Sequence, residues 1–181
     1  MKTMCTVHGV MLEVSGRGLL ITGAAGIGKS ELGLALVCLG HRLVADDVVE
    51  FRRQGNDLIA LRDPQYAGFV ALRDLGVVNL MMIYGAAAST DRQRLDLILE
   101  LVKAGAQTEP GIEDLGGRRA TRRILDVEIP SVKLVADGGR PLAQLAEVAV
   151  RDQQARDRGY RADLDLEAKQ HQRVEDMATW S

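Results

Sequence analysis

The sequence predicts an α/β fold in which a mixed sheet carries flanking helices. The first observation behind this prediction is a strand-like apolar run at residues 18–22 that leads into a glycine-rich loop and then into helical spacing over residues 31–39. The second is Gly40, which stands where a helix C-terminal cap is expected. The third is the length of 181 residues, which suits one core, so we expect a single domain over residues 1–181.

The loop at residues 23–30 reads G-A-A-G-I-G-K-S and fits the phosphate-loop pattern G-x-x-x-x-G-K-[S/T]. Its glycines let backbone N–H groups converge on phosphate oxygens, Lys29 brings a positive charge to the outer phosphates, and Ser30 offers a hydroxyl to Mg²⁺. The helix N-terminus after the loop adds N–H groups and its dipole. We therefore predict a bound nucleoside triphosphate, held by Gly23, Ala24, Ala25, Gly26, Ile27, Gly28, Lys29 and Ser30.

The composition narrows the class of protein. Apolar residues make up 46% and charged residues 27%, as in globular proteins, while aromatic residues are only 3%, so aliphatic side chains must fill the core. A net charge of −2 gives no basic field, and we expect no nucleic-acid partner. Cys5 and Cys38 are too few for a disulfide framework or a zinc site. Without a signal-peptide pattern or an apolar run near the ~20 residues of a membrane span, we expect a cytoplasmic protein with no membrane partner.

The segments around the phosphate loop are mostly strand-like. Residues 1–15 predict one or two strands, residues 41–45 a short buried strand, and residues 48–61 a hairpin. Residues 62–84 contain breakers at Pro64 and Gly68, and we expect only that they lie near the site. The apolar run at 77–84 is compatible with a subunit interface, although burial in the core is the commoner explanation.

The second half of the chain gives clearer helix patterns. Thr90 and Gln93 match a capping box, and the apolar spacing that follows predicts a helix that ends before Gly105. Residues 124–129 predict a strand stopped by Pro130, residues 132–136 a further strand, and helices are expected from Leu142 and over residues 163–178. Residues 106–123 predict an exposed loop that ends in a basic cluster of Arg118, Arg119, Arg122 and Arg123.

Two adjacent carboxylates, Asp46 and Asp47, follow the predicted strand at residues 41–45. Neighbours on a strand point to opposite faces, so the two carboxylates should have different roles. One is suited to hold Mg²⁺ or its water and the other to take the proton of an attacking hydroxyl, as in kinases. The alternative is that the pair only caps a turn. His8 lies in a predicted turn before the nucleotide-binding strand, and a lone histidine there is more often structural or solvated than catalytic.

Three blocks of sequence together resemble a known family. They read T-V-H-G-V-M from Thr6, L-L-I-T-G-A-A-G-I-G-K-S-E from Leu19 and G-H-R-L-V-A-D-D from Gly40. In this order and spacing they resemble the catalytic, C-terminal domain of bacterial HPr kinase/phosphorylase. The likeness covers nearly the whole chain. It is densest from His8 to Glu50, fades between residues 52 and 130, and returns at residues 139–143, 147–149 and 159–160. The family's N-terminal domain is missing from the sequence, so we expect either a short or divergent form of the family or a part of a longer protein.

The resemblance implies a fold related to phosphoenolpyruvate carboxykinase, a hexameric homo-oligomer and two Mg²⁺-dependent activities. One activity is phosphorylation of a serine on the phosphocarrier protein HPr by ATP or pyrophosphate, and the other is phosphorolysis of that phosphoserine by inorganic phosphate. It also implies that His8, Lys29, Asp47 and Arg140 are catalytic, with Asp47 as proton acceptor of the kinase step and proton donor in phosphorolysis. The implied magnesium ligands are Ser30 and Asp46.

The chain departs from the family pattern at four positions, one of which is Pro141, where the family has an asparagine. Ala71 stands where a signature close to L-E-I-R-G-L-G supplies a magnesium-binding glutamate. Asp114 replaces an arginine, although Arg118 and Arg119 follow closely, and Asp137 replaces a basic residue in the loop used for dephosphorylation. A carboxylate near a phosphate adds repulsion where a cation should assist. We therefore expect a kinase whose phosphorolysis is weak or lost.

Two other functions stay open at this point. The altered signature is compatible with a kinase of the same fold that acts on a different substrate. The loss of the glutamate also suits a nucleotide-sensing regulatory protein that transfers no phosphate. Retention of His8, Asp46 and Asp47 favours catalysis over the sensor, because a pure nucleotide binder needs only the phosphate loop.

Overall fold

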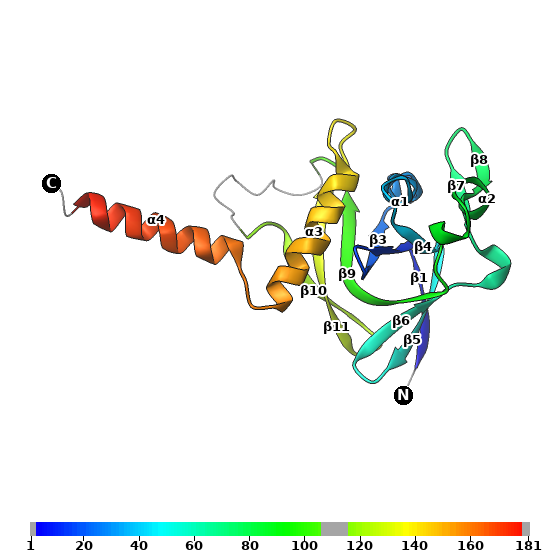
Figure 1. Cartoon of the computed structure of the whole chain (residues 1–181), viewed down its shortest axis with the longest axis horizontal. Helices are drawn as coiled ribbons and strands as arrows, with labels where there is room; N and C mark the ends of the chain where they lie inside the picture. The colour runs from blue at the N-terminus through cyan, green and yellow to red at the C-terminus, as the bar shows by residue number, and fades with distance from the viewer. Residues whose placement is uncertain (1–2, 106–115, 179–181) are drawn as a thin grey trace.

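The computed structural model describes residues 3–105 and 116–178, and Figure 1 shows how their elements are arranged. In this described part, nine strands form one sheet with the order β1-β5-β6-β9-β3-β2-β4, to which β11 and β10 are added beside β9, and β7 and β8 form a separate hairpin. The strands are β1 (Met4–His8), β2 (Val10–Val14), β3 (Arg17–Gly23), β4 (Arg42–Ala45), β5 (Val48–Gln54), β6 (Asp57–Leu61), β7 (Phe69–Leu72), β8 (Gly76–Asn79), β9 (Arg92–Val102), β10 (Arg119–Ile124) and β11 (Val127–Val135). The helices are α1 (Lys29–Cys38), α2 (Leu80–Tyr84), α3 (Leu142–Asp157) and α4 (Ala162–Ala178), with short 3-10 turns η1 (Pro64–Tyr66) and η2 (Ala86–Ala88).

Strand β9 joins the two parts of the sheet. Along one edge it runs parallel to β3, and along the other it pairs antiparallel with β6 and then parallel with β11. Because β3, β9 and β11 are parallel, their carboxyl ends lie at the same edge of the sheet. The phosphate loop after β3 and the segment at residues 136–141 after β11 therefore belong to one edge.

Two apolar cores lie on opposite faces of the central strands. In β3, Leu19 and Ile21 enter the first core and Leu20 enters the second, as alternation along a strand requires. The first core also takes side chains from α1 and α3, including Leu36 and Ala146. Buried strand residues make up the second core, with Phe51 among its largest side chains. Apart from Phe51 the cores are almost entirely aliphatic, as the composition predicts.

The predicted α/β class, the helix after the loop, the hairpin at residues 48–61 and both C-terminal helices are confirmed. Helix α1 ends with paired backbone hydrogen bonds, from the N–H of Gly40 to the carbonyl of Val37 at 2.9 Å and from the N–H of His41 to the carbonyl of Leu36 at 3.1 Å. This is the glycine-terminated cap that the sequence predicts.

The helix predicted between Thr90 and Gly105 is wrong, because residues 92–102 form strand β9. The strand is buried on both faces, so Leu97, Leu99 and Leu101 contact one core and Ile98 the other. A run of apolar residues that is buried on both sides satisfies helical spacing as well as strand spacing. Pairing with β3, β6 and β11 decides between them.

The prediction for residues 118–130 also needs correction. The basic cluster that was expected in a loop lies partly in β10, an edge strand that pairs only with β11 within the described residues. A two-residue turn at Leu125 and Asp126, both with positive φ, then reverses the chain. Pro130 does not stop the next strand, because β11 continues through it and its pairing with β9 begins only at Ser131.

Most of residues 77–84 lie outside the core, since Leu80 is buried and Val78 packs against the first core while half-buried. Val77 lies on β8, and the segment from Leu80 to Tyr84 is a short helix. Several large apolar side chains of this region are exposed, namely those of Leu75, Val77, Met82, Ile83 and Tyr84. Burial in the chain's own core therefore does not explain the run.

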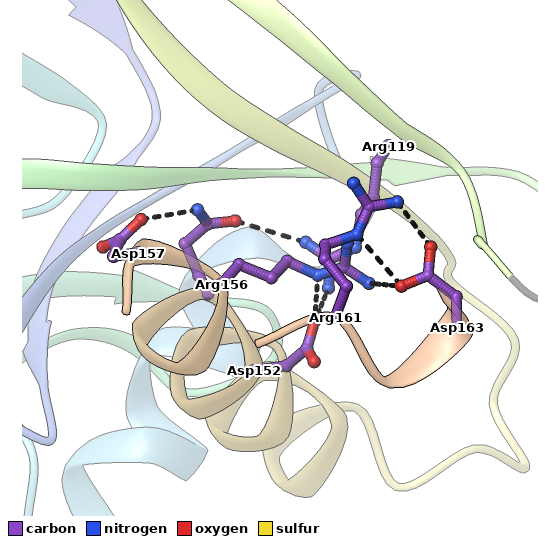
Figure 2. A network of polar contacts seen from close by, with 7 residues as sticks. Arg119, Asp152, Arg156, Asp157, Arg161 and Asp163 are labelled. Atoms are coloured by element: carbon purple, nitrogen blue, oxygen red, sulfur yellow. Dashed lines mark hydrogen bonds and ion pairs between the residues drawn. The ribbon is translucent and has the colours of Figure 1, made fainter. Parts of the chain in front are cut away.

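A network of ion pairs joins α3, α4 and β10 (Figure 2). Asp163 at the start of α4 accepts hydrogen bonds from Arg156 of α3 at 3.2 Å and from Arg161 at 2.5 Å, and these hydrogen bonds and charges hold its pKa well below the usual range. Arg156 also binds Asp152, which is paired with Arg119. Beyond this junction α4 extends away from the rest of the chain (Figure 1). No helix in the described ranges is long and apolar enough to cross a membrane.

Gly18 allows β3 and β9 to approach closely. A Cβ atom at this position would lie 1.8 Å from the carbonyl oxygen of Arg94 and 2.7 Å from the terminal methyl of Met11. The Gly18 N–H also donates to Asp96 Oδ2 at 2.8 Å. The pairing that carries the phosphate loop therefore requires the absence of a side chain here.

We predict that Gly18→Ala lowers the free energy of unfolding by about 2–3 kcal/mol, because the added methyl group forces β3 away from β9. Urea denaturation followed by circular dichroism measures the change. Gly138→Ala is the matched control, since a Cβ atom there meets nothing within 4 Å and the backbone φ is ordinary. Equal stability of the two variants would contradict this account of the β3–β9 contact.

Candidate functional site

The phosphate loop lies between the end of β3 and the first turn of α1. Gly28, with φ of 104°, has a left-handed backbone that favours glycine, and it directly precedes the helix. The carbonyl of Gly28 accepts the N–H of Leu32 at 3.0 Å, which starts the helical ladder. The free N–H groups of the first helical turn therefore face the mouth of the loop, as anion binding requires.

Lys29 lies against its own loop. Its Nζ donates to the carbonyl of Gly23 at 3.1 Å and to that of Ala24 at 3.0 Å. The same side chain lines a cavity of about 290 Å³ together with Ser30. Lys29 thus brings one positive charge, suited to phosphate oxygens, to the cavity.

Asp46 joins three segments at this cavity. Its Oδ1 accepts the Ser30 hydroxyl at 2.9 Å, and its Oδ2 accepts the backbone N–H of Ala71 at 3.3 Å. Burial raises the pKa of the Asp46 carboxyl, and the hydrogen bonds only partly oppose that shift. Hard oxygen ligands of this kind suit Mg²⁺, which takes one or two protein oxygens and completes its shell with phosphate and water. Among the described residues there is no cluster of three or more acidic, histidine or cysteine side chains that could hold a metal ion alone.

Asp47 has very different surroundings from Asp46. Its side chain is 82% exposed, and Oδ1 lies 3.8 Å from Nδ1 of His8, itself 84% exposed. The backbone of Asp47 has φ of 69°, a strained value for a residue other than glycine, and its carbonyl accepts the N–H of Gly9 at 3.0 Å. The turn therefore holds one carboxylate inward and the other outward. Both residues follow β4 instead of lying on it, and the different roles expected for them stay a prediction.

A second, larger cavity adjoins the first. It has a volume of about 710 Å³, and we call it the acceptor cavity. Asp46, Asp47 and Ala71 line both cavities and so form the boundary between them. A donor bound at the phosphate loop and a molecule in the acceptor cavity would therefore meet at the acidic pair.

The other residues expected at the site are arranged as follows. Arg140 is exposed at the sheet edge that carries the loop, but it lines neither of the two cavities. Asp137 is exposed in the same segment, where its carbonyl accepts the N–H of Arg140 at 3.0 Å. Arg119 cannot stand in for the missing arginine as it lies here, because Asp152 and Gln153 of α3 hold its guanidinium. Asp114 lies outside the described residues.

The structure adds two residues to those expected from the sequence. Arg73, from the β7–β8 turn, donates from Nη2 to the carbonyl of Gly26 at 2.8 Å and from its backbone N–H to Oε1 of Glu31 at 3.4 Å. Both residues line the phosphate-loop cavity. One signal for Arg73 was present in the sequence, because this residue stands in the stretch that matches the family signature. The contact between Arg73 and Glu31, which lie 42 positions apart, could not be predicted from the sequence.

We predict that Asp46→Asn raises the melting temperature at pH 7, because it removes a charge whose burial is unfavourable. The raised pKa means that native Asp46 binds a proton at a higher pH than in the unfolded chain, where the ordinary value is 3.8. The advantage of the variant should therefore shrink as the pH falls toward 4.

Differential scanning calorimetry between pH 4 and pH 7 measures this trend. Asp47→Asn is the control, since it removes a charge from a side chain in solvent and asparagine tolerates a positive φ. A melting temperature at pH 7 below that of the wild type would contradict the predicted cost of burying Asp46.

Comparisons with known proteins agree with this arrangement. A family model described as HPr Serine kinase C-terminal domain matches residues 1–170. The HPr kinase/phosphorylase of Bordetella avium is 43% identical over 148 residues, which cover 81% of this chain and 47% of that protein. The corresponding protein of Geobacillus kaustophilus is 36% identical over 173 residues, or 95% of this chain and 55% of that protein.

A solved structure of the Hpr(Ser) kinase/phosphatase from Coxiella burnetii superposes with a TM-score of 0.81 at 32% identity, covering 86% of this chain and 94% of that one. The chain spans about half the length of the curated relatives described above. Because the family model matches nearly the whole length of this chain, the chain belongs to the HPr serine kinase C-terminal domain family.

Proposed function

We propose that this chain is a Mg²⁺-dependent serine protein kinase that transfers the terminal phosphoryl group of ATP, or a phosphoryl group of pyrophosphate, to HPr or a related phosphocarrier protein. The observation that carries the proposal is the boundary between the two cavities, where Asp46 and Asp47 face a phosphate-binding loop on one side and the acceptor cavity on the other. The relatives in the comparison are named HPr kinase/phosphorylase, which supports the choice of acceptor.

The donor side of the site binds the phosphates. The backbone N–H groups of residues 23–30 and the ammonium of Lys29 hold the phosphate oxygens, and Lys29 exchanges its present carbonyl partners for them. Ser30 and Asp46 are the residues that would hold Mg²⁺, since their oxygens lie 2.9 Å apart at the edge of this cavity. When bound, the ion neutralises phosphate charge and orients the terminal group.

The acceptor side supplies a serine hydroxyl. Its oxygen attacks the terminal phosphorus, the bond from that phosphorus to the bridging oxygen breaks, and ADP leaves. The proton of the hydroxyl passes to the carboxylate of Asp47, which is exposed and therefore free to meet the acceptor. His8, 3.8 Å from Asp47, is suited to orient this carboxylate, and its protonated form would add a favourable charge.

Phosphorolysis is the weaker half of the proposed activity. Ala71 has no side-chain oxygen for a metal, and only its backbone N–H reaches Asp46. Arg119 is occupied by α3, and Asp137 has the wrong charge for a phosphate. Arg140 is the one cation in the loop at residues 136–141, and we assign it to binding of inorganic phosphate or phosphoserine.

A nucleotide-sensing protein without transfer is the alternative, favoured by the missing ligand at Ala71. An assay with labelled ATP, Mg²⁺ and purified HPr discriminates between the kinase and the nucleotide sensor. Phosphoserine on HPr supports the kinase, transfer to a different protein supports a kinase with another substrate, and ATP binding without transfer supports the sensor.

We predict that Asp47→Asn lowers kcat for phosphoryl transfer by about 10²- to 10⁴-fold, because the hydroxyl loses its proton acceptor. The affinity for an ATP analogue should change little, since the phosphate loop is intact. Rapid-quench measurement of phosphoserine gives the first quantity and calorimetric titration the second. Unchanged transfer by the variant would refute the assignment of Asp47.

We predict that Ala71→Glu tightens Mg²⁺ binding about tenfold, because a third oxygen ligand joins those of Ser30 and Asp46. Calorimetric titration of Mg²⁺ in the presence of a non-hydrolysable ATP analogue measures the affinity. Ala120→Glu on exposed β10 is the matched control for the added charge. Equal Mg²⁺ affinity of the two variants would argue against a metal site at this boundary.

A further inference from the structure

The acceptor cavity has three walls. One is the solvent-facing side of the β1-β5-β6 part of the sheet, where Glu50 pairs with Thr6 on one neighbouring strand and with Leu61 on the other, and all three residues line the cavity. Glu50 faces this side because its neighbours Val49 and Phe51 point into the second core. The η1 turn with the β7–β8 hairpin forms the second wall, and the end of β4 with the acidic pair forms the third.

The charges that line this cavity are mostly negative. Glu50 and Asp63 add two carboxylates to those of Asp46 and Asp47. Glu50 has no hydrogen-bond or ion-pair partner for its side chain within residues 3–105 and 116–178. A cationic group that enters the cavity would therefore find an unpaired carboxylate.

Arg62 is the one cation that lines the cavity in the described part of the chain, and other partners hold it. Its guanidinium pairs with Asp91, donates to the hydroxyl of Ser89 at 3.2 Å and contacts the Met81 sulfur at 3.7 Å. With 18% of its side chain exposed, it has little freedom to turn toward Glu50. The negative field of the cavity thus stays uncompensated.

Aromatic side chains stand beside these carboxylates. Tyr66 is 69% exposed and Phe69 is 45% exposed, and both line the cavity. An aromatic face attracts a cation, and an apolar wall accommodates the methylene stem that carries it. Carboxylates next to exposed aromatic rings therefore form a site suited to a lysine or arginine side chain.

We infer that the acceptor cavity binds a basic side chain of the protein substrate, one that lies next to the phosphate-accepting serine and rests between Glu50, Asp63 and the Tyr66 and Phe69 rings. This inference rests on the proposed kinase function and adds the determinant of its specificity. The same field weakens binding of the product, because the new phosphoserine carries negative charge near the carboxylates of Glu50 and Asp63. The cavity therefore selects a basic acceptor segment and favours release of the phosphorylated one.

The test compares Glu50→Gln, Asp63→Asn and the double variant with wild type, using purified HPr as the acceptor. We expect the KM for HPr to rise about threefold to tenfold in each single variant, because a charge-assisted contact is lost, with kcat within about twofold. The rise of KM with ionic strength should also be flatter in the variants. Glu128→Gln, at an exposed carboxylate on β11 outside the cavity, is the matched control and should leave KM unchanged.

HPr variants complete a double-mutant cycle. Each lysine or arginine within four residues of the acceptor serine is changed to glutamine in turn. For one of them, Glu50→Gln should have no further effect on KM. If wild-type enzyme phosphorylates HPr and KM is the same in Glu50→Gln, Asp63→Asn and wild type, or if no HPr variant removes the effect, the inference is overturned while the kinase function stands.

A binding measurement separates failure of the inference from failure of the proposed function. If wild-type enzyme transfers no phosphate, the affinity for fluorescently labelled HPr is measured by anisotropy with MgADP present. Binding weakened by Glu50→Gln and Asp63→Asn, and not by Glu128→Gln, supports the basic-residue site without catalysis. Equal affinity of all four proteins, or no binding at all, overturns it.

Discussion

The hydrogen bond between the Ser30 hydroxyl and the Asp46 carboxylate is the constraint on which the rest of the site depends. A carboxylate that is removed from water is costly unless it finds hydrogen-bond donors. Asp46 finds two of them, one at the start of α1 and one on the backbone of β7. The need to satisfy one half-buried charge thus joins the phosphate loop, the end of β4 and the β7–β8 hairpin.

The adjacent acids have opposite physical situations, and this suits them to different work. Burial keeps Asp46 in a fixed place at the edge of the loop, where a metal ligand is useful. Asp47 is held outward by a strained backbone and remains in solvent, where it can meet a mobile acceptor. Strain of this kind persists when the surroundings impose it, and here the hydrogen bond from Gly9 to the Asp47 carbonyl contributes.

The acceptor side arises from the shape of the sheet. Alternation along β5 buries Val49 and Phe51 and, for the same reason, turns Glu50 toward the cavity. The separate β7–β8 hairpin closes the other side and brings Phe69 and Val77 opposite. One face of β5 thus packs in the core, and the other face carries the carboxylate to which we assign recognition. A cation bound at this wall would lie next to the carboxylates that perform the proposed transfer.

Local sequence was sufficient for the phosphate loop, its helix and the position of the acidic pair, because backbone requirements of glycine and short spacing define them. The prediction was wrong at β9, because a strand that is buried on both faces has apolar spacing that also fits a helix. It was wrong at β10 as well, because an exposed edge strand lacks the apolar alternation by which a strand is recognised. It also missed the contact of Arg73 with Gly26 and the exposure of the run at residues 77–84. Each of these depends on a neighbour distant in the chain.

The amino-acid pattern alone was therefore enough to place a loop of phosphate-binding type and two carboxylates at a strand end, and to suggest the family to which the chain belongs. Contacts between distant segments were needed to show which carboxylate is half-buried, which arginine reaches the loop, and where the acceptor cavity lies. The reason is that burial and charge at a site are set by segments that meet in space. Glu50 and Tyr66 gain a shared role only when β5 and the η1 turn border the same cavity.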